Sequence, residues 1–425
     1  MNHTRNANEF DAIVVGSGPA GATVARELSK RKKRVLIVER GASAPIKEGF
    51  LPAMRMFNAV SVGENLTTAN AFTTGGTTAI YFAVSGFPPL QSFLSLGIDL
   101  SSELEEVKQE LPLAVLPDEV ASYQARKVRE SALALGYQWK KSPMLVDQAK
   151  CRTGYNFDAK WNARSYLQEA VDEGATLITH ARVIKVLVES GKAIGVEYKL
   201  QNGSNESGVR QAFATKTILA AGVLESPTIL RATGMRNVIN SGFYCCPTFA
   251  LFGLAPGMEG GDNFMGSMGG ELEDGIALGD ANPARTIYRM FMIGNGRFSR
   301  AFQHHKSIGV AVKVQEGLSG GLQEDGRYYK KLKKEDFLKL KKGEEAARRI
   351  IENAGGKRIF KSRLSAAQTG GTIRIKEHLD VNLQTEYTNL HVCDGAVLPE
   401  NLKVPPTLPL ICLGKYLANR MSPVL

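Results

Sequence analysis

The chain has 425 residues, of which 43% are hydrophobic and 22% charged, and its formal net charge is +11. This length allows a large core and about two domains, and the composition excludes a disordered or fibrous protein. The basic residues are spread along the chain, and the densest run, residues 327–349, is interleaved with Glu and Asp. We expect a solvated helix face there, with an acidic partner or an anionic membrane as the alternative, and no nucleic-acid-binding module.

The N-terminal residues, the apolar runs and the cysteines indicate the cellular compartment. The first nine residues are polar and lead directly into an apolar strand, so we expect no signal peptide. No apolar run approaches the ~20 residues that cross a bilayer, so we expect no membrane span. The cysteines lack framework spacing, which favours a reducing, cytoplasmic setting, and His and Cys do not cluster as metal ligands do. The five cysteines are Cys151, Cys245, Cys246, Cys393 and Cys412.

The first ordered segment predicts a nucleotide site. Residues 11–15 form an apolar, β-branched run typical of a strand buried on both faces. Gly16, Gly18 and Gly21 follow at the spacing G-x-G-x-x-G. The first glycine allows a tight turn, the second lets the backbone approach a pyrophosphate, and the third lets the following helix pack closely on the strand.

The continuation of this segment completes the pattern. A helix is expected over residues 20–31, with its positive N-terminal end at the pyrophosphate. A second buried run, residues 35–38, ends in Glu39, whose carboxylate can accept hydrogen bonds from ribose hydroxyls. Dinucleotide binding follows from this arrangement, while the choice between FAD and NAD stays open at this point.

A second glycine-rich stretch follows at residues 71–86, which read AFTTGGTTAIYFAVSG. Two glycines and two hydroxyl residues let backbone and Oγ atoms lie close to a ligand, and a helix beginning here would present free N–H groups. The alternative is a helix cap with no ligand.

The rest of the chain alternates helices and strands. The run TILAAG, residues 217–222, predicts a short buried strand whose small terminal residues permit close approach to the nucleotide. The expected helices cover residues 99–113, 121–135, 161–172, 226–233, 334–354 and 407–421, and the expected strands include a hairpin turning at residues 190–191 and residues 211–214, 243–252, 286–293, 307–314 and 390–393.

This order predicts an α/β fold of two intertwined parts. A doubly wound, Rossmann-like nucleotide-binding domain is expected to comprise residues 1–86, 155–240 and 365–425. Residues 87–154 and 241–364 are expected to build a second, antiparallel-sheet substrate domain over the cofactor.

At this point the sequence resembles the glucose–methanol–choline (GMC) oxidoreductases, a family of FAD enzymes. The resemblance implies FAD, in keeping with the lack of a second G-x-G-x-x-G unit. Five stretches carry it: GSGPAG with Glu39, GGTTAIY at 75–81, the block at 160–183, AAGVLESPTILRATGM at 220–235, and the closing strand, loop and helix at 392–421.

The resemblance implies a set of cofactor-binding residues. Ile80 stands where some members attach the flavin covalently to histidine, so the FAD is expected to be non-covalent. Val183 would meet the adenine through its backbone, and the helix beginning at Pro406 would aim its dipole at the flavin pyrimidine. The full set is Gly16, Ser17, Gly18, Pro19, Ala20, Gly21, Glu39, Arg40, Gly75, Gly76, Thr77, Thr78, Val183, Ala221, Gly222, Asp394, Gly395, Pro406, Thr407 and Leu408.

The chain departs from the family at the catalytic pair. Members that oxidise alcohols carry a base histidine in an H-P-x-G-T stretch, and here that stretch is QTGGT, with Gln368 in the place of the histidine. The second position, usually His or Asn, is Pro405. An amide has no accessible pKa and proline has no side-chain donor, so neither residue can act as the usual base.

Three interpretations remain. The chain is an FAD-dependent oxidoreductase that transfers hydride between an organic CH–OH or CH–CH donor and flavin N5 with another proton-transfer group. Alternatively, the flavin does other chemistry, as in a C=C reductase or desaturase, an isomerase, a lyase or a decarboxylase, or the chain is a non-catalytic FAD-binding subunit. The expected partner is a small organic substrate, while the electron acceptor and the oligomeric state stay open. Candidate replacements for the base are Tyr81, Tyr244, His304, His305 and His378.

Overall fold

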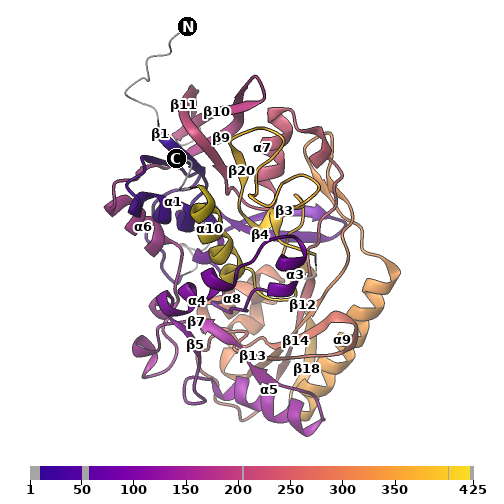
Figure 1. The fold of residues 1–425 in the computed structure, drawn as a ribbon. Coiled ribbons are helices and arrows are strands. Elements are labelled where there is room, and N and C mark those ends of the chain that lie inside the picture. Colours follow the sequence, from indigo (N-terminus) through magenta and orange to yellow (C-terminus); the bar gives the residue numbers. More distant parts are fainter. Residues whose placement is uncertain (1–9, 50–56, 203–204, 401, 422–425) are drawn as a thin grey trace.

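The computed structural model describes residues 10–49, 57–202, 205–400 and 402–421. Two sheets organise the chain, each with its own core (Figure 1). One sheet lies with β1, β11, β10, β9 and β20 in the half that holds both ends of the described chain, and the other lies with β12, β13, β14 and β18 in the opposite half (Figure 1). The helices are α1 (Pro19–Lys30), α3 (Leu90–Ser95), α4 (Ser101–Glu110), α5 (Tyr123–Ala134), α6 (Arg164–Asp172), α7 (Glu225–Thr233), α8 (Arg285–Gly294), α9 (Lys334–Asn353) and α10 (Thr407–Met421).

The first sheet has seven strands in the order β8-β2-β1-β11-β10-β9, with β20 paired to β11. The pairings β8–β2, β2–β1, β1–β11 and β11–β20 are parallel, whereas β9, β10 and β11 form an antiparallel meander. The strands are β1 (Phe10–Val15), β2 (Val35–Val38), β8 (Thr176–Ile178), β9 (Ala181–Glu189), β10 (Lys192–Asn202), β11 (Asn205–Leu219) and β20 (Leu390–Val392).

Helix α1 joins this sheet to the closing helix. Every residue of β2 and the last four of β1 are buried, as expected for strands covered on both faces. α1 packs against both α6 and α10, and α10 also packs on α4. The crossing of α1 and α10 is close, because a Cβ on Gly414 would lie 2.8 Å from Thr23 Cβ.

The second sheet has nine strands in the order β3-β4-β19-β12-β15-β14-β13-β6, with β18 paired to β12. Helices α9 and α5 pack on it. Its strands are β3 (Phe57–Gly63), β4 (Leu66–Ala71), β6 (Lys140–Lys141), β12 (Pro247–Leu254), β13 (Met268–Glu271), β14 (Ile276–Asp280), β15 (Ser307–Val314), β18 (Lys357–Lys361) and β19 (Ser365–Ala366); two small ladders pair β5 (Leu113–Val115) with β7 (Pro143–Leu145) and β16 (Gly321–Leu322) with β17 (Tyr328–Tyr329).

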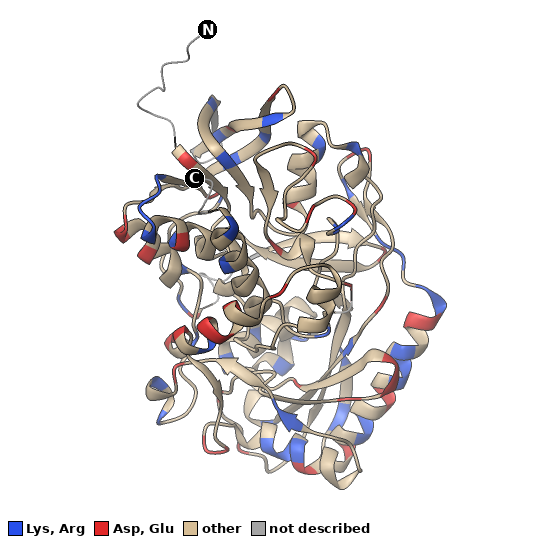
Figure 2. Cartoon of the chain, viewed as in Figure 1, with Lys and Arg blue, Asp and Glu red and all other residues tan. Residues whose placement is uncertain are grey.

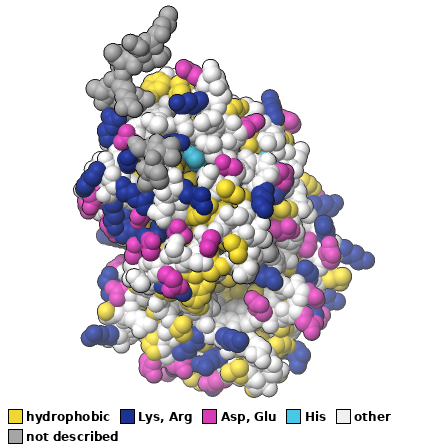
Figure 3. All heavy atoms as spheres, in the orientation of Figure 1, with side chains coloured by type: hydrophobic (Ala, Val, Ile, Leu, Met, Phe, Trp, Pro, Cys, Tyr) yellow, Lys and Arg dark blue, Asp and Glu magenta, His cyan; other side chains and the backbone are white. Residues whose placement is uncertain are grey.

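The charged run 327–349 falls largely on α9, as the sequence predicts. Its apolar residues recur at helical spacing and face β15, with Leu340, Ala347 and Ile350 buried. Lys, Arg, Asp and Glu alternate along its other face (Figure 2), and basic and acidic side chains are also intermingled on the face drawn in Figure 3. No helix in the described parts of the chain is both long and apolar enough to cross a membrane.

One predicted strand is a helix in the structure. Residues 286–293, predicted as a strand, lie in helix α8, where Tyr288 and Met292 are buried one turn apart. The helix begins with a hydrogen bond from Arg285 N to Asp262 Oδ1 (2.6 Å), a distant cap that local sequence does not reveal. Strands β3 and β4 pair into the second sheet, although the sequence places residues 1–86 with the nucleotide-binding part. The division into domains stays a prediction.

A buried ion pair lies under one edge of the second sheet. Lys330 Nζ is 3.1 Å from Glu316 Oε1, and both side chains are almost fully buried. The Glu316 carboxylate also accepts hydrogen bonds from Cys245 N (2.5 Å) and Cys246 N (3.1 Å). Cys246 has φ of +46°, a left-handed backbone that is costly for a residue other than glycine. The carboxylate therefore holds a strained segment in place.

Replacing Lys330 with Met should destabilise the protein by about 3–5 kcal/mol, because the Glu316 charge would stay buried without its partner. The double variant E316Q/K330M should recover part of this loss. Urea unfolding measures both, and K342M is the control, since its ion pair with Glu273 is exposed and should contribute less than about 1 kcal/mol. Equal stability of K330M and K342M would show that the buried pair does not hold this segment.

Candidate functional site

Four strand ends converge at one edge of the parallel sheet. Val15 pairs with Val38 and with Leu219, and Leu219 pairs with Val392. The chain segments that follow these residues begin with Gly16, Glu39, Ala220 and Cys393. Ligands of open α/β sheets bind outside the carboxyl ends of the strands, so this edge is the expected nucleotide site.

The turn after β1 combines close packing with one open position. A Cβ on Gly16 would lie 2.4 Å from Ala220 O, and one on Gly21 would lie 2.2 Å from Gly16 O. These two glycines are therefore required by packing. A Cβ on Gly18 would meet no atom within 4 Å, and Gly18 immediately precedes α1. The open position thus lies at a helix N-terminus, where a phosphate group fits.

Glu39 is buried at the end of β2 and points back to this turn. Its carboxylate accepts hydrogen bonds from Ser17 N (3.0 Å), Ser17 Oγ (2.6 Å) and Gly41 N (2.7 Å). Burial raises the pKa of Glu39, and the hydrogen bonds from Ser17 and Gly41 oppose that rise. A carboxylate has about four acceptor positions, so the site keeps capacity for a ribose hydroxyl.

The GGTT stretch docks on the same turn. Gly75 N donates to Ser17 Oγ (3.2 Å), and a Cβ on Gly76 would lie 2.9 Å from Gly18 Cα. Thr78 Oγ1 donates to Gly75 O (2.6 Å) and accepts from Ala163 N (3.0 Å), while Thr77 is exposed. The expected helix is only a 3₁₀ turn, Gly76–Ala79. Next to it, Thr74 Oγ1 is buried and has no hydrogen-bond partner among the described residues.

Asp394 holds the segment after β11. Its carboxylate accepts from Gly222 N (2.8 Å), Ser226 Oγ (2.5 Å) and Ala396 N (2.8 Å). Burial raises the pKa of Asp394, and these hydrogen bonds lower it. Gly222 has φ of +96°, and a Cβ there would meet no atom within 4 Å. Gly222 thus leaves a second open position, beside Ala221.

Two further predicted cofactor residues have other contacts. Arg40 pairs with Glu225 (2.8 Å) and lies over the ring of Phe72. Val183 is buried in β9, two residues after Ala181, whose N–H donates to Glu39 O (2.9 Å). Val183 therefore follows the segment that passes the end of β2, whereas Arg40 is engaged with α7.

Gln368 lies beside the segment that contains Pro405, and the placement of both residues at the flavin stays a prediction. Gln368 Nε2 donates to Val404 O (2.7 Å), directly before Pro405, and Gln368 Oε1 accepts from Lys313 Nζ (2.8 Å). Both ends of the amide are therefore engaged. Pro406 follows Pro405, and Thr407 and Leu408 begin α10, so Gln368 links the second sheet to the N-terminus of the closing helix.

The backbone explains this placement. Gln368 N donates to Cys245 O (3.3 Å), and Tyr244 and Gly370 exchange two backbone hydrogen bonds of 3.0 Å each. The QTGGT stretch thus continues the pairing of β19 with β12 along the segment that Glu316 holds. Lys313 lies on β15, the neighbour of β12.

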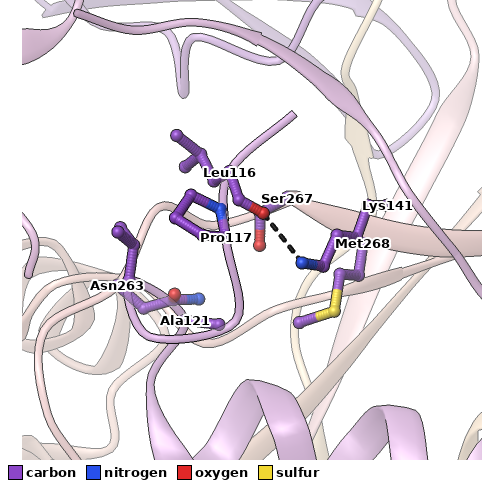
Figure 4. Close-up of a pocket in the computed structure, with 8 residues that line it drawn as sticks. Leu116, Pro117, Ala121, Lys141, Asn263, Ser267 and Met268 are labelled. Carbon is purple, nitrogen blue, oxygen red and sulfur yellow. Dashed lines mark hydrogen bonds between the residues drawn. The ribbon is translucent and has the colours of Figure 1, made fainter. Parts of the chain in front are cut away.

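Gln368 and Lys313 line a cavity of about 250 Å³. Tyr244, Cys246, Lys313, Gln368 and Val404 line its inner part, and the exposed Glu271, Asp274, Glu400 and Lys403 lie at its mouth. Burial raises the pKa of the Cys246 thiol to about 12, so the thiol is protonated at neutral pH. A second hollow, between Leu116 and Met268, has only about 10 Å³ and is partly closed by the bond from Lys141 Nζ to Leu116 O (Figure 4). It has room for at most one water.

Of the candidate bases, Tyr244 lines the cavity, whereas the three histidines and Tyr81 lie elsewhere. His304 and His305 precede β15, so Lys313 is roughly 20 Å farther along the strand. His304 Nε2 is 2.9 Å from Pro283 O, and His378 bonds to Arg374 N (2.9 Å) and Asn237 O (3.2 Å). Tyr81 donates its hydroxyl to Trp161 O, and burial raises its pKa. None of these four lines the cavity.

Sequence reasoning missed Lys313. The available signal is a single lysine in the apolar strand SIGVAVKV, whose buried residues Val310, Val312 and Val314 alternate with Ala311 and Lys313. Alternation places Lys313 on the face opposite the valines. In the described parts of the chain, no group of three His, Cys, Asp or Glu side chains could hold a metal ion.

Residues 97–247 match the family described as GMC oxidoreductase, and residues 14–44 match an NAD(P)-binding Rossmann-like domain. Over residues 97–247 the chain is thus similar to GMC oxidoreductases. It is 22% identical to a long-chain-alcohol oxidase of Arabidopsis thaliana over 97% of this chain and 68% of that protein. It is 28% identical to an uncharacterised GMC-type oxidoreductase of Mycobacterium tuberculosis over 53% of this chain and 39% of that protein.

Solved structures show the same fold. A formate oxidase of Aspergillus oryzae, in a study of FAD modification, superposes with a TM-score of 0.73 over 98% of both chains at 14% identity. Members of the GMC family bind FAD, and the residues of this chain fit that group: Gly18 and Gly222 leave open positions at the sheet edge, and Glu39 and Thr74 keep unused polar capacity.

Gly18→Ala should weaken FAD binding by about tenfold or more, because its Cβ would occupy the open position needed for close approach of a pyrophosphate. The apo protein should keep its stability, since Gly18 has φ of −65° and its Cβ would meet no atom within 4 Å. Fluorescence titration with FAD and thermal unfolding measure the two effects.

Gly294→Ala is the matched control, because a Cβ at Gly294 also meets no atom within 4 Å but lies at the end of α8. Equal FAD affinity of G18A and G294A would contradict this placement of the pyrophosphate.

Proposed function

We propose that the chain is an FAD-dependent oxidoreductase acting on the CH–OH group of a small organic substrate. When bound, FAD would supply a hydride acceptor at N5. The observation that carries the proposal is the cavity at Gln368. This cavity lies beside the N-terminus of α10, and α10 packs on α1, the helix that begins at the expected pyrophosphate site. The long-chain-alcohol oxidase and the formate oxidase among the similar proteins support oxidation chemistry.

The residues have distinct proposed roles. Gly18 and Gly222 admit the pyrophosphate, Glu39 accepts from the ribose, and the N-terminal turn of α10 favours negative charge at the flavin. Ile80 has no nucleophilic atom, so the FAD is held non-covalently at that position. The substrate is small, because about 250 Å³ is just below the usual range of ligand cavities.

Proton transfer is non-standard in this proposal: while hydride leaves the carbon for the flavin, the hydroxyl proton passes to water at the exposed cavity mouth. The Gln368 amide cannot accept a proton, its oxygen and nitrogen are both engaged, and the Cys246 thiol is already protonated. Gln368 instead acts as a positioning residue that holds Lys313 and the closing loop at a fixed separation. All five cysteines are buried and free, which supports the proposal of a reducing, cytoplasmic setting.

The test is anaerobic bleaching of the flavin absorbance by a panel of small alcohols, hydroxy acids, saturated and unsaturated carbonyls and carboxylic acids. CH–OH donors should bleach the wild-type protein. Gln368→Ala should slow bleaching by about 10²-fold through misplacement of the cavity wall, with unchanged FAD content. Gln168→Ala, on the exposed part of α6, is the control.

Bleaching by none of the CH–OH donors, with reoxidation of dithionite-reduced protein by an unsaturated carbonyl, would contradict the proposal and favour C=C reduction. Loss of FAD from Q368A would contradict the positioning role.

A further inference from the structure

Lys313 is a cation turned into the cavity from an apolar strand. It shares the strand face of Ala311, while Val310, Val312 and Val314 face the core. Its neighbours in the sheet are Thr248 and Ala277, neither of which carries a charge. Lys313 is half-buried, and its Nζ donates one hydrogen bond, to Gln368 Oε1 at 2.8 Å. An ammonium group has three donors, so two remain for another partner.

The described residues provide no counter-charge for this lysine. None of their carboxylates forms an ion pair with Lys313: Glu271 lies exposed at the cavity mouth, and three other nearby acids are engaged elsewhere. Glu316 pairs with Lys330, Asp274 pairs with Lys342 (3.5 Å), and Glu400 accepts from Leu318 N (3.0 Å). A partly desolvated charge is costly unless it is paired, so the cavity is suited to an incoming anion.

A second donor lines the same cavity. Tyr244 is 3% exposed, and its hydroxyl is buried with no hydrogen-bond partner among the described residues. The ring lies over Gly370, where a Cβ would be 2.2 Å from the Tyr244 hydroxyl oxygen. An ammonium and a hydroxyl donor together match the two oxygens of a carboxylate, which forms its strongest hydrogen bonds with charged donors.

We propose that Lys313 anchors a carboxylate of the substrate, with Tyr244 as the second donor, so that the substrate class is small hydroxy acids rather than neutral alcohols. This inference rests on the proposed function, which it narrows. Lys313 is a specificity residue here. A bound carboxylate neutralises the charge of its ammonium group, which a neutral alcohol would not do. The cavity mouth carries Glu271, Asp274 and Glu400 beside Lys403, so the attraction for an anion comes from Lys313 inside the cavity.

Binding of acetate and acetamide to the FAD-loaded protein tests this without turnover. The two probes have the same shape and differ in charge. Isothermal titration calorimetry should show acetate binding at least about tenfold more tightly than acetamide, and Lys313→Gln should remove that difference, about 1.4 kcal/mol or more. Lys313→Arg should retain it, because the guanidinium keeps the charge.

Lys216→Gln is the matched control, because Lys216 is also half-buried and also donates to an amide oxygen, Asn389 Oδ1, at 2.8 Å. K216Q should bind acetate as the wild type does. FAD content and thermal unfolding verify that each variant is folded. If K313Q does not fold, the acetate and acetamide affinities of K313R still test the inference.

Equal affinity for acetate and acetamide, no acetate binding at all, or full acetate binding by K313Q would overturn the inference. The outcomes separate it from the proposed function. If neutral alcohols bleach the flavin while acetate fails to bind, the oxidoreductase proposal stands and the anchor fails. If acetate binds through Lys313 while no CH–OH donor bleaches the flavin, the anchor stands and the oxidoreductase proposal fails.

Discussion

The parallel register of β2, β1, β11 and β20 is the constraint on which the site depends. It brings the segments after Val15, Val38, Leu219 and Val392 to one sheet edge, although they lie far apart in the chain. The glycines after β1 have two different roles. Gly16 and Gly21 permit close packing, while Gly18 leaves space at the N-terminus of α1. A shift of one residue in this register would separate the turn from the Glu39 carboxylate.

A second constraint sets the substrate side. The buried Lys330–Glu316 pair fixes the backbone of Cys245 and Cys246, and that backbone in turn pairs with the stretch containing Gln368. Gln368 then bonds both Lys313 and Val404 O. Through this series of contacts, the second sheet determines where the closing loop and the first turn of α10 lie. The amide at position 368 thus has a structural task, since its oxygen accepts from Lys313 while its nitrogen donates to Val404 O.

Local pattern was sufficient for the nucleotide side. Glycine spacing, buried strand runs and the terminal acid gave Gly16, Gly18, Gly21 and Glu39 their places, because those contacts follow from a compact β-α-β unit. Long-range contacts could not be predicted from the sequence. Helix α8 is capped by Asp262, and β4 pairs with β19, a strand nearly 300 residues away in the chain. The sequence identified the altered pair at 368 and 405 but not Lys313, because only the pairing of β12 with β15 brings that lysine to Gln368.

The measurement that tests the central claim most directly is a crystal structure of the protein with FAD bound. The account predicts the pyrophosphate over Gly18 at the N-terminus of α1, the ribose at Glu39, and the flavin ring bordering the cavity that holds Gln368 and Lys313. A flavin ring lying away from that cavity, with Gln368 and Pro405 both out of side-chain reach of it, would contradict the account.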